Sequence, residues 1–306
     1  MKKRNSLLLL LLIPIILLLI KPLPFFVLLS PLVLLLVYPH PNMPPSRIES
    51  ISRQWIPGIK SSVQLMKSPA TDYALLRRFD TIFVIDDSTS MRGQNWKETL
   101  DALVNISPMC TKHDPDGIDI YFLNHRNSKD IQGGAYKMVT TPQSVERIFG
   151  CVYPSGGTPI GARLREILEP YMEDLAESLR HRGTDTDSTS TVRPINIIVI
   201  TDGKPTDGLE NDLVATIVAT ANQLDIWRAD EWQVGIQFFQ VGHDEEVTRY
   251  LKYLDDNLSE EYGVRDIVDT VTWDKDPGEL SADTILKVVL GAVHRGYDRQ
   301  RVRTSF

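Results

Sequence analysis

The sequence predicts an α/β domain in which helices cover both faces of a mostly parallel sheet. From about residue 76 onward, short runs of Val, Ile and Phe alternate with stretches whose apolar residues recur at helical spacing. Several of the short runs are apolar throughout, which is typical of parallel strands buried on both faces. Loops rich in Asp, Ser and Thr adjoin these runs. Together these observations indicate a three-layer, doubly wound architecture.

Six strands are predicted along the chain. The first, residues 80–86, reads DTIFVID and is apolar at residues 82–85. The second, 117–124, alternates Ile and Phe with polar residues, and a third is expected at 135–140. The most apolar strand, INIIVITDG at residues 195–203, is expected to be central. The last two strands are predicted at residues 233–241 and 264–271.

The intervening helices are predicted from caps and apolar stripes. Asn95, followed three residues later by Glu98, has the pattern of a capping box and predicts a helix start. Thr158 is expected to cap a long helix with Pro159 at its first position, where a missing N–H costs nothing. The other predicted helices cover residues 142–150, 208–226, 244–256 and 281–294, and residues 182–192 are predicted to be a surface loop.

The N-terminal residues suggest a membrane segment. From Leu7 to Val37 the only charged residue is Lys21. A single helix over this stretch would be about 46 Å long, against about 30 Å for a hydrocarbon core, and Pro22 and Pro24 make an unbroken helix unfavourable. Three interpretations stay open: one kinked span, a hairpin of two short arms, or an unusual N-terminus on a soluble domain.

The predicted organisation has four parts. They are a hydrophobic membrane segment (1–40), a Pro-rich linker with a short helix (41–75), the α/β domain (76–300) and a tail (301–306). We expect the protein to be membrane-associated. The sequence leaves open which side of the membrane the domain occupies, and a cytoplasmic protein is the alternative.

Composition excludes some classes of function. The chain of 306 residues has a formal net charge of −7, and it has no long Lys/Arg run that would form a nucleic-acid surface. The two cysteines, Cys110 and Cys151, are far apart in sequence, which excludes a Cys-rich zinc site. Whether they form a disulfide stays open.

Three polar loops are predicted to meet at one edge of the sheet. DDSTS follows the first strand, SGGTP precedes the long helix, and TDGKPTD follows the strand at 195–203. Ligands bind at this edge in such sheets, outside the carboxyl ends of the strands. The loops offer carboxylates and hydroxyls without His or Cys, so they suit a hard divalent cation: Mg²⁺, or alternatively Mn²⁺ or Ca²⁺.

These loops resemble the metal-ion-dependent adhesion site of von Willebrand factor type A (vWA) domains. The family pattern is D-x-S-x-S after the first strand, then a Thr, then an Asp after a hydrophobic strand. The matching residues are Asp86, Ser88, Ser90, Thr158 and Asp202. The resemblance covers about residues 76–300, and Thr89 stands where the family more often has Gly. It implies a Rossmann-like vWA fold.

The resemblance also implies a protein-binding module rather than an enzyme. In the family, these five positions hold the metal ion, and an Asp or Glu of a partner protein completes its coordination. Asp87 occupies the variable position and is expected to face water or to cap the loop. Asp207 is expected to cap a helix rather than to bind metal.

Two other functions remain as alternatives. A Mg²⁺-dependent phosphotransfer-type hydrolase would use Asp86 as nucleophile and Lys204 as the phosphate partner. A structural docking domain would instead carry a vestigial metal site and bind through its helices. Metal-dependent binding of an acidic peptide separates the docking domain from the predicted binding module.

Overall fold

The computed structural model describes residues 74–113, 116–181, 192–209, 212–272 and 287–293. The chain divides into two compact units, residues 1–66 and 67–306, and all described residues belong to the second. The predicted membrane segment, nearly all of the linker, the loop at 182–191 and the tail lie outside the described residues. Within the described ranges, no helix has the length and apolarity needed to span a membrane.

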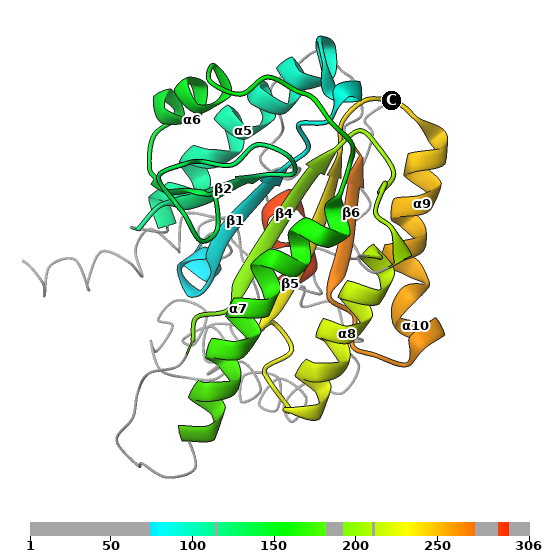
Figure 1. Ribbon diagram of the computed structural model, residues 1–306. Coiled ribbons are helices and arrows are strands. Elements are labelled where there is room, and N and C mark those ends of the chain that lie inside the picture. Colours follow the sequence, from blue (N-terminus) through cyan, green and yellow to red (C-terminus); the bar gives the residue numbers. More distant parts are fainter. Residues whose placement is uncertain (1–73, 114–115, 182–191, 210–211, 273–286, 294–306) are drawn as a thin grey trace, which may run out of the picture. The chain divides into compact units, whose positions relative to one another are not determined.

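In the described part of the chain, six strands form one sheet in the order β3-β2-β1-β4-β5-β6 (Figure 1). Their bounds are Asp80–Ile85 (β1), Ile118–Phe122 (β2), Tyr136–Val139 (β3), Ile195–Thr201 (β4), Val234–Gln240 (β5) and Val268–Thr272 (β6). Only the edge strand β3 pairs antiparallel with its neighbour; the other described pairings are parallel. The predicted α/β class with a mostly parallel sheet is therefore confirmed.

Except between β2 and β3, helices connect the strands in the predicted alternation. Those described are α5 (Gln94–His113), α6 (Pro142–Phe149), α7 (Ile160–His181), α8 (Leu213–Ile226), α9 (Glu245–Asp256) and α10 (Leu258–Tyr262), with short 3-10 helices η1 (Ala74–Arg78), η2 (Thr89–Met91) and η4 (Gly291–Val293). Helix α8 begins later than predicted because Asp212 caps it, accepting a hydrogen bond from the Ala215 N–H at 2.9 Å. Helix α10 was not predicted. The helix predicted at 281–294 is described only from residue 287.

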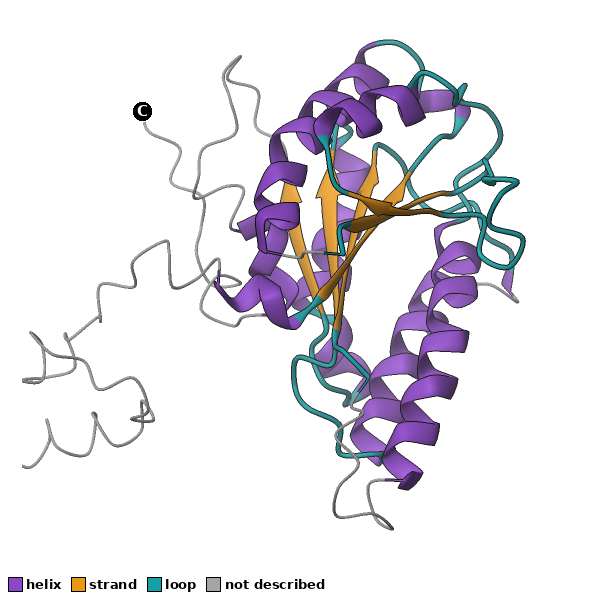
Figure 2. Ribbon diagram, turned by 90° about the vertical axis from the view of Figure 1, so that its left-hand side faces the viewer, coloured by secondary structure: helices purple, strands orange, loops and turns teal. Residues whose placement is uncertain are grey.

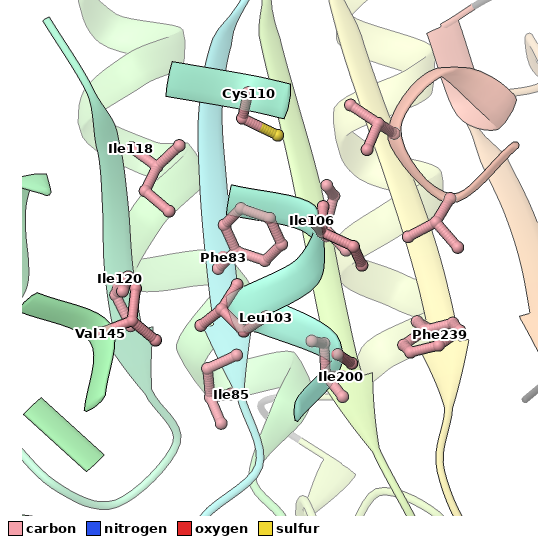
Figure 3. Packing of buried hydrophobic residues seen from close by; sticks show 14 of the residues in the cluster. Phe83, Ile85, Leu103, Ile106, Cys110, Ile118, Ile120, Val145, Ile200 and Phe239 are labelled. Carbon is pink, nitrogen blue, oxygen red and sulfur yellow. The ribbon is translucent and has the colours of Figure 1, made fainter. Parts of the chain in front are cut away.

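One face of the sheet packs against α5 and α6. Phe83 and Ile85 of β1 point to this side, where Leu103 and Ile106 of α5 cover them (Figure 3). Cys110, one turn further along α5, is buried in the same core. It is a free thiol, and so is the exposed Cys151.

The other face packs against α7, α8 and α9. Ile82 and Val84 of β1 point to this side, so alternate residues of one strand serve two cores. Leu164 of α7 and Ile217 of α8 belong to the second core. Figure 2 shows helices on both sides of the sheet, so the domain has the predicted three layers.

Candidate metal and partner-binding site

The site lies where the direction of strand order reverses. β1 and β4 are hydrogen-bonded neighbours, although the chain forms β2 and β3 between them. The connections on either side of such a pair lead away from each other, leaving a crevice outside the carboxyl ends of the strands. Asp86 directly follows β1, and Asp202 directly follows β4. Two of the predicted ligands therefore flank this crevice.

Asp86 is fully buried and its two oxygens have different donors. Its Oδ1 accepts a hydrogen bond from the Ser88 N–H at 2.8 Å, which curls the loop back on itself. Its Oδ2 accepts a hydrogen bond from the Thr201 hydroxyl at 2.6 Å. Thr201 is the last residue of β4, so the carboxylate joins the ends of the two central strands.

The two serines connect this loop to Asp202. The Ser88 and Ser90 hydroxyl oxygens lie 3.0 Å apart, and Ser90 Oγ donates to Asp202 Oδ1 at 2.8 Å. The other oxygen of Asp202 accepts a hydrogen bond from Asn95 Nδ2 at 2.7 Å. The structure thus brings Ser88, Ser90 and Asp202 into one chain of hydrogen bonds.

Asn95 does not form the capping box that the sequence predicted. Helix α5 begins at Gln94, so Asn95 is its second residue, and its side chain reaches Asp202 instead. Glu98 accepts a hydrogen bond from Gln94 Nε2 at 3.0 Å. The Asn95 side chain thus bonds a residue distant in sequence instead of capping its own helix, and Asn95 belongs to the site.

Thr158 lies beside the residue that follows Asp202. It is buried, and a Cβ built on Gly203 would be 3.6 Å from the Thr158 hydroxyl oxygen. The Thr158 N–H donates to Thr206 Oγ1 at 2.8 Å, and its carbonyl accepts from the Thr206 N–H at 2.9 Å. This pair of bonds holds the SGGTP loop against the loop after β4.

Asp207, rather than Thr158, supplies the side-chain cap of α7. Its oxygens accept hydrogen bonds from the N–H groups of Gly161 and Ala162, both at 2.9 Å. The predicted cap role of Asp207 is confirmed, although the helix it caps is the preceding one in sequence. The predicted Thr158 cap is wrong, since the helix starts at Ile160 and the Asp207 carboxylate occupies its end.

Asp87 is a structural residue behind the site. It is 1% exposed, so the expectation that it faces water is wrong. Its oxygens accept three hydrogen bonds, from Asn124 N at 2.7 Å, Asn124 Nδ2 at 3.1 Å and His125 N at 2.8 Å. Asn124 Nδ2 also donates to the Gly157 carbonyl at 2.9 Å. Asp87 therefore fixes the loop after β2 and, through Asn124, the glycine loop.

The electrostatics of the site favour a cation. The pKa of Asp86 is raised to about 6, chiefly by burial and to a smaller extent by the charge of Asp202, against opposing hydrogen bonds from Thr201 and Ser88. Within the described part of the chain, neither aspartate forms an ion pair with Lys or Arg. A positive charge between them would relieve both the desolvation and the mutual repulsion.

The donor set suits a hard divalent ion. Asp86 and Asp202 supply carboxylate oxygens, and Ser88, Ser90 and Thr158 supply hydroxyl oxygens, which are the ligands that Mg²⁺, Mn²⁺ and Ca²⁺ prefer. The described residues contain no group of three or more His, Cys, Asp and Glu side chains arranged to hold a metal. The candidate set is not of that kind, because three of its five members are hydroxyls.

Comparison with protein families gives a match over this same region. The model of the von Willebrand factor type A domain matches residues 80–262, more than half of the chain. The chain belongs to the vWA family. No curated protein matches it. The vWA match spans β1 to α10 and includes all five candidate ligands.

Proposed function

We propose that this vWA domain binds a partner protein through a divalent cation held by Asp86, Ser88, Ser90, Thr158 and Asp202. An Asp or Glu side chain of the partner completes the coordination of the ion. The vWA fold is typical of protein-interaction modules, many of them metal-dependent. The observation that carries the proposal is the hydrogen-bonded chain from Asp86 through the serines to Asp202, with two carboxylates and no basic partner in the described residues.

The composition of the ligand set supports recognition of an external acid. Only two of its five members are charged, so a divalent ion would keep an affinity for a further negative ligand. Ser90 is exposed, whereas Asp86 is fully buried. The ion would therefore be held from the buried side and approached from the Ser90 side.

Calorimetric titration of the protein with Mg²⁺ and Mn²⁺ tests the metal site. Wild type should take up one ion, and Asp86→Ala should take up none, because it removes a buried charge. Ser88→Ala should bind more weakly but measurably, because it removes only a dipole. Circular dichroism should show all three folded, since the strands and the helix stripes are untouched. If wild type takes up no ion, the proposal fails and the alternative of a structural docking domain with a vestigial metal site is favoured.

We also propose that the domain is not an enzyme. A phosphotransfer site would need Lys204 for the phosphate, but its Nζ lies 2.8 Å from Glu246 Oε2 in an exposed ion pair. The carboxylate of Asp86, the nucleophile in that mechanism, is fully buried and accepts two hydrogen bonds. Phosphatase assays on wild type and Asp86→Ala should give the same background rate; activity lost in the variant would favour the hydrolase.

Membrane association through residues 1–40 is a further part of the proposal. Its support is the sequence alone, since these residues lie outside the described ranges. Protease treatment of intact membrane vesicles should leave the domain either protected or digested, which assigns its side. Recovery of the full chain in the soluble fraction without detergent would contradict membrane attachment.

A further inference from the structure

An exposed aromatic residue, Tyr153, stands on the loop that leads to the candidate metal site. Its side chain is 72% exposed, whereas its neighbours Val152 and Pro154 are both buried. A tyrosine that contributed to the core would be covered like them. Tyr153 therefore presents its ring to solvent from a backbone that is anchored on both sides.

Hydrogen bonds tie this loop directly to the loop that carries Asp86. The Ser155 N–H, two residues after Tyr153, donates to the Asp87 carbonyl at 2.6 Å. The Thr89 N–H donates to the Gly156 carbonyl at 3.2 Å. These bonds attach the Tyr153 loop to the segment between Asp86 and Ser90, so the ring stands at the edge of the candidate ligand set.

Arg92 holds the ring in place from one side. Its guanidinium carbon lies 4.8 Å from the centre of the Tyr153 ring, a cation–π contact. Its Nε donates to the Pro154 carbonyl at 2.8 Å, so the guanidinium is itself fixed. One face of the ring is thus occupied by a cation, and the exposure of the side chain leaves the other available.

The chemistry of this arrangement restricts what can lie on the open face. Tyrosine side chains with little freedom are frequent anchors in protein interfaces, because ordering them costs little entropy. A second cation on the ring would face the charge of Arg92 across it, whereas an apolar or aromatic side chain would bury ring area without that repulsion.

We propose that Tyr153 and Arg92 form a second contact for the partner, which carries a large apolar or aromatic residue next to its metal-binding Asp or Glu. This inference rests on the proposed function and specifies the partner sequence. The recognised element is a short acidic–apolar segment of a protein, with the carboxylate at the ion and the apolar side chain on the Tyr153 ring.

Peptide selection tests the two parts separately. The full-length chain, purified in detergent and immobilised with Mg²⁺, is offered a phage library of random linear peptides, and bound phage are eluted with chelator. Wild type should enrich an Asp or Glu with a large apolar or aromatic neighbour. The Tyr153→Ser variant should still enrich the acid without the neighbour, and should bind the wild-type peptides about tenfold or more weakly.

Two further variants serve as controls for the role of the Tyr153 ring. Tyr153→Phe retains the ring and should retain the neighbour preference. Tyr262→Ser removes another exposed tyrosine, 47% exposed, at the end of α10, which precedes β6 and so lies toward the opposite edge of the sheet; it should behave as wild type. Thermal melts check that each variant is folded.

The outcomes distinguish the two proposals. Chelator-eluted peptides with an acid but random or basic neighbours, or with equal affinity for Tyr153→Ser, would overturn the Tyr153 contact and leave the metal-dependent function standing. Failure to recover any chelator-sensitive peptide on wild type would overturn the proposed function itself, and the Tyr153 contact with it.

Discussion

Two groups of buried polar side chains lie on the same sheet and differ in how their hydrogen bonds are satisfied. The loop cluster, Asp86 and Asp87, follows β1 at its carboxyl end. The polar row, Thr81, Asn196 and Gln237, crosses β1, β4 and β5 further from that end. All five side chains are at most 2% exposed, so burial alone does not separate the groups.

In the loop cluster every carboxylate oxygen has a donor. Asp86 accepts hydrogen bonds from Ser88 and Thr201, one at each oxygen. Asp87 accepts three from Asn124 and His125. These partners come from three separate segments, so the loops cannot shift independently.

In the polar row several atoms have no such partner. Among the described residues, Thr81 Oγ1, Asn196 Oδ1 and both polar atoms of the Gln237 amide have no hydrogen bond. Asn196 Nδ2 does donate to the Val289 carbonyl at 2.5 Å. Gly291 packs closely above the row: a Cβ there would lie 2.3 Å from Gln237 Oε1.

The difference in hydrogen bonding predicts that the loop cluster is rigid and that the polar row lowers the stability of the domain. An unsatisfied buried polar group costs about 1 to 3 kcal/mol, so the polar row should reduce the stability of the domain, whereas the loop cluster should hold its carboxylates in one geometry. Changes in the loop cluster should therefore be costly, and replacement of Gln237, whose amide has no hydrogen bond among the described residues, should be neutral or favourable.

The largest expected effect comes from Asp87→Ala. It leaves the backbone N–H groups of Asn124 and His125 without this acceptor and removes one of the two acceptors of Asn124 Nδ2, so we expect the free energy of unfolding to fall by roughly 3 kcal/mol. Metal uptake should weaken as well, because Asp87 would no longer fix the position of Asn124, whose side chain bonds the glycine loop. Urea unfolding measures the loss. Asp87→Asn keeps one acceptor oxygen and should lose less; equal stability of Asp87→Ala and wild type would show that the three bonds are dispensable.

The fold was predictable because its signals are local. Strands such as β4, buried at all seven positions, and helices with a clear stripe, such as α7, appear close to the predicted bounds. The antiparallel direction of β3 was not predicted, since four residues carry no signal of direction. Helix α10 was missed because five residues give too little periodicity.

The site was predictable only in part. The five candidate ligands follow from a motif, but the residues that hold them do not. Asn95 and Asp202 are 107 positions apart, and Thr201 and Asp86 are 115 apart. Local patterns assigned Asn95 to a helix cap, because a local sequence pattern contains no information about a partner that is distant in sequence. The one available signal was the position of Thr201 at the end of the most apolar strand, directly before Asp202.

A smaller effect is expected for Asn95→Ala, which removes the donor to Asp202 Oδ2. Residues that orient metal ligands typically contribute 10- to 100-fold to affinity, so Mg²⁺ affinity should fall by about tenfold or more. The free energy of unfolding with chelator should change little, because Asn95 is only half-buried. Gln94→Ala, at the neighbouring exposed position, is the control. Unchanged affinity in calorimetry would show that Asn95 does not orient Asp202.

The pH dependence of the metal-free protein tests the burial of Asp86. Its pKa is about 6 when folded, against 3.8 for an ordinary aspartate. The folded state therefore binds more protons between these values, so this contribution to stability is present at low pH and is lost as the pH rises through 6. Between pH 5 and pH 7, wild type in chelator should lose about 1 kcal/mol relative to Asp86→Asn. An equal change in the free energy of unfolding between pH 5 and pH 7 for the two proteins would contradict the burial of a titrating carboxyl.

The sharpest comparison comes from two glutamines of β5. Gln237 and Gln240 are both fully buried. Gln240 Nε2 donates to the Asp244 carbonyl at 3.0 Å, and its Oε1 accepts from the Thr248 hydroxyl at 2.8 Å. Gln237 has neither kind of bond among the described residues.

Substitution by Met, which is unbranched and of similar length, should therefore destabilise the domain at Gln240 but not at Gln237. Gln237→Met removes two unsatisfied atoms and should leave the free energy of unfolding unchanged or raise it by about 1 kcal/mol. Gln240→Met breaks satisfied bonds and should lower it by about 1 to 2 kcal/mol. Urea unfolding of the two variants side by side measures the difference. A loss at Gln237 equal to that at Gln240 would mean that the Gln237 amide is satisfied in the native protein, and the contrast between the row and the loop cluster would not hold there.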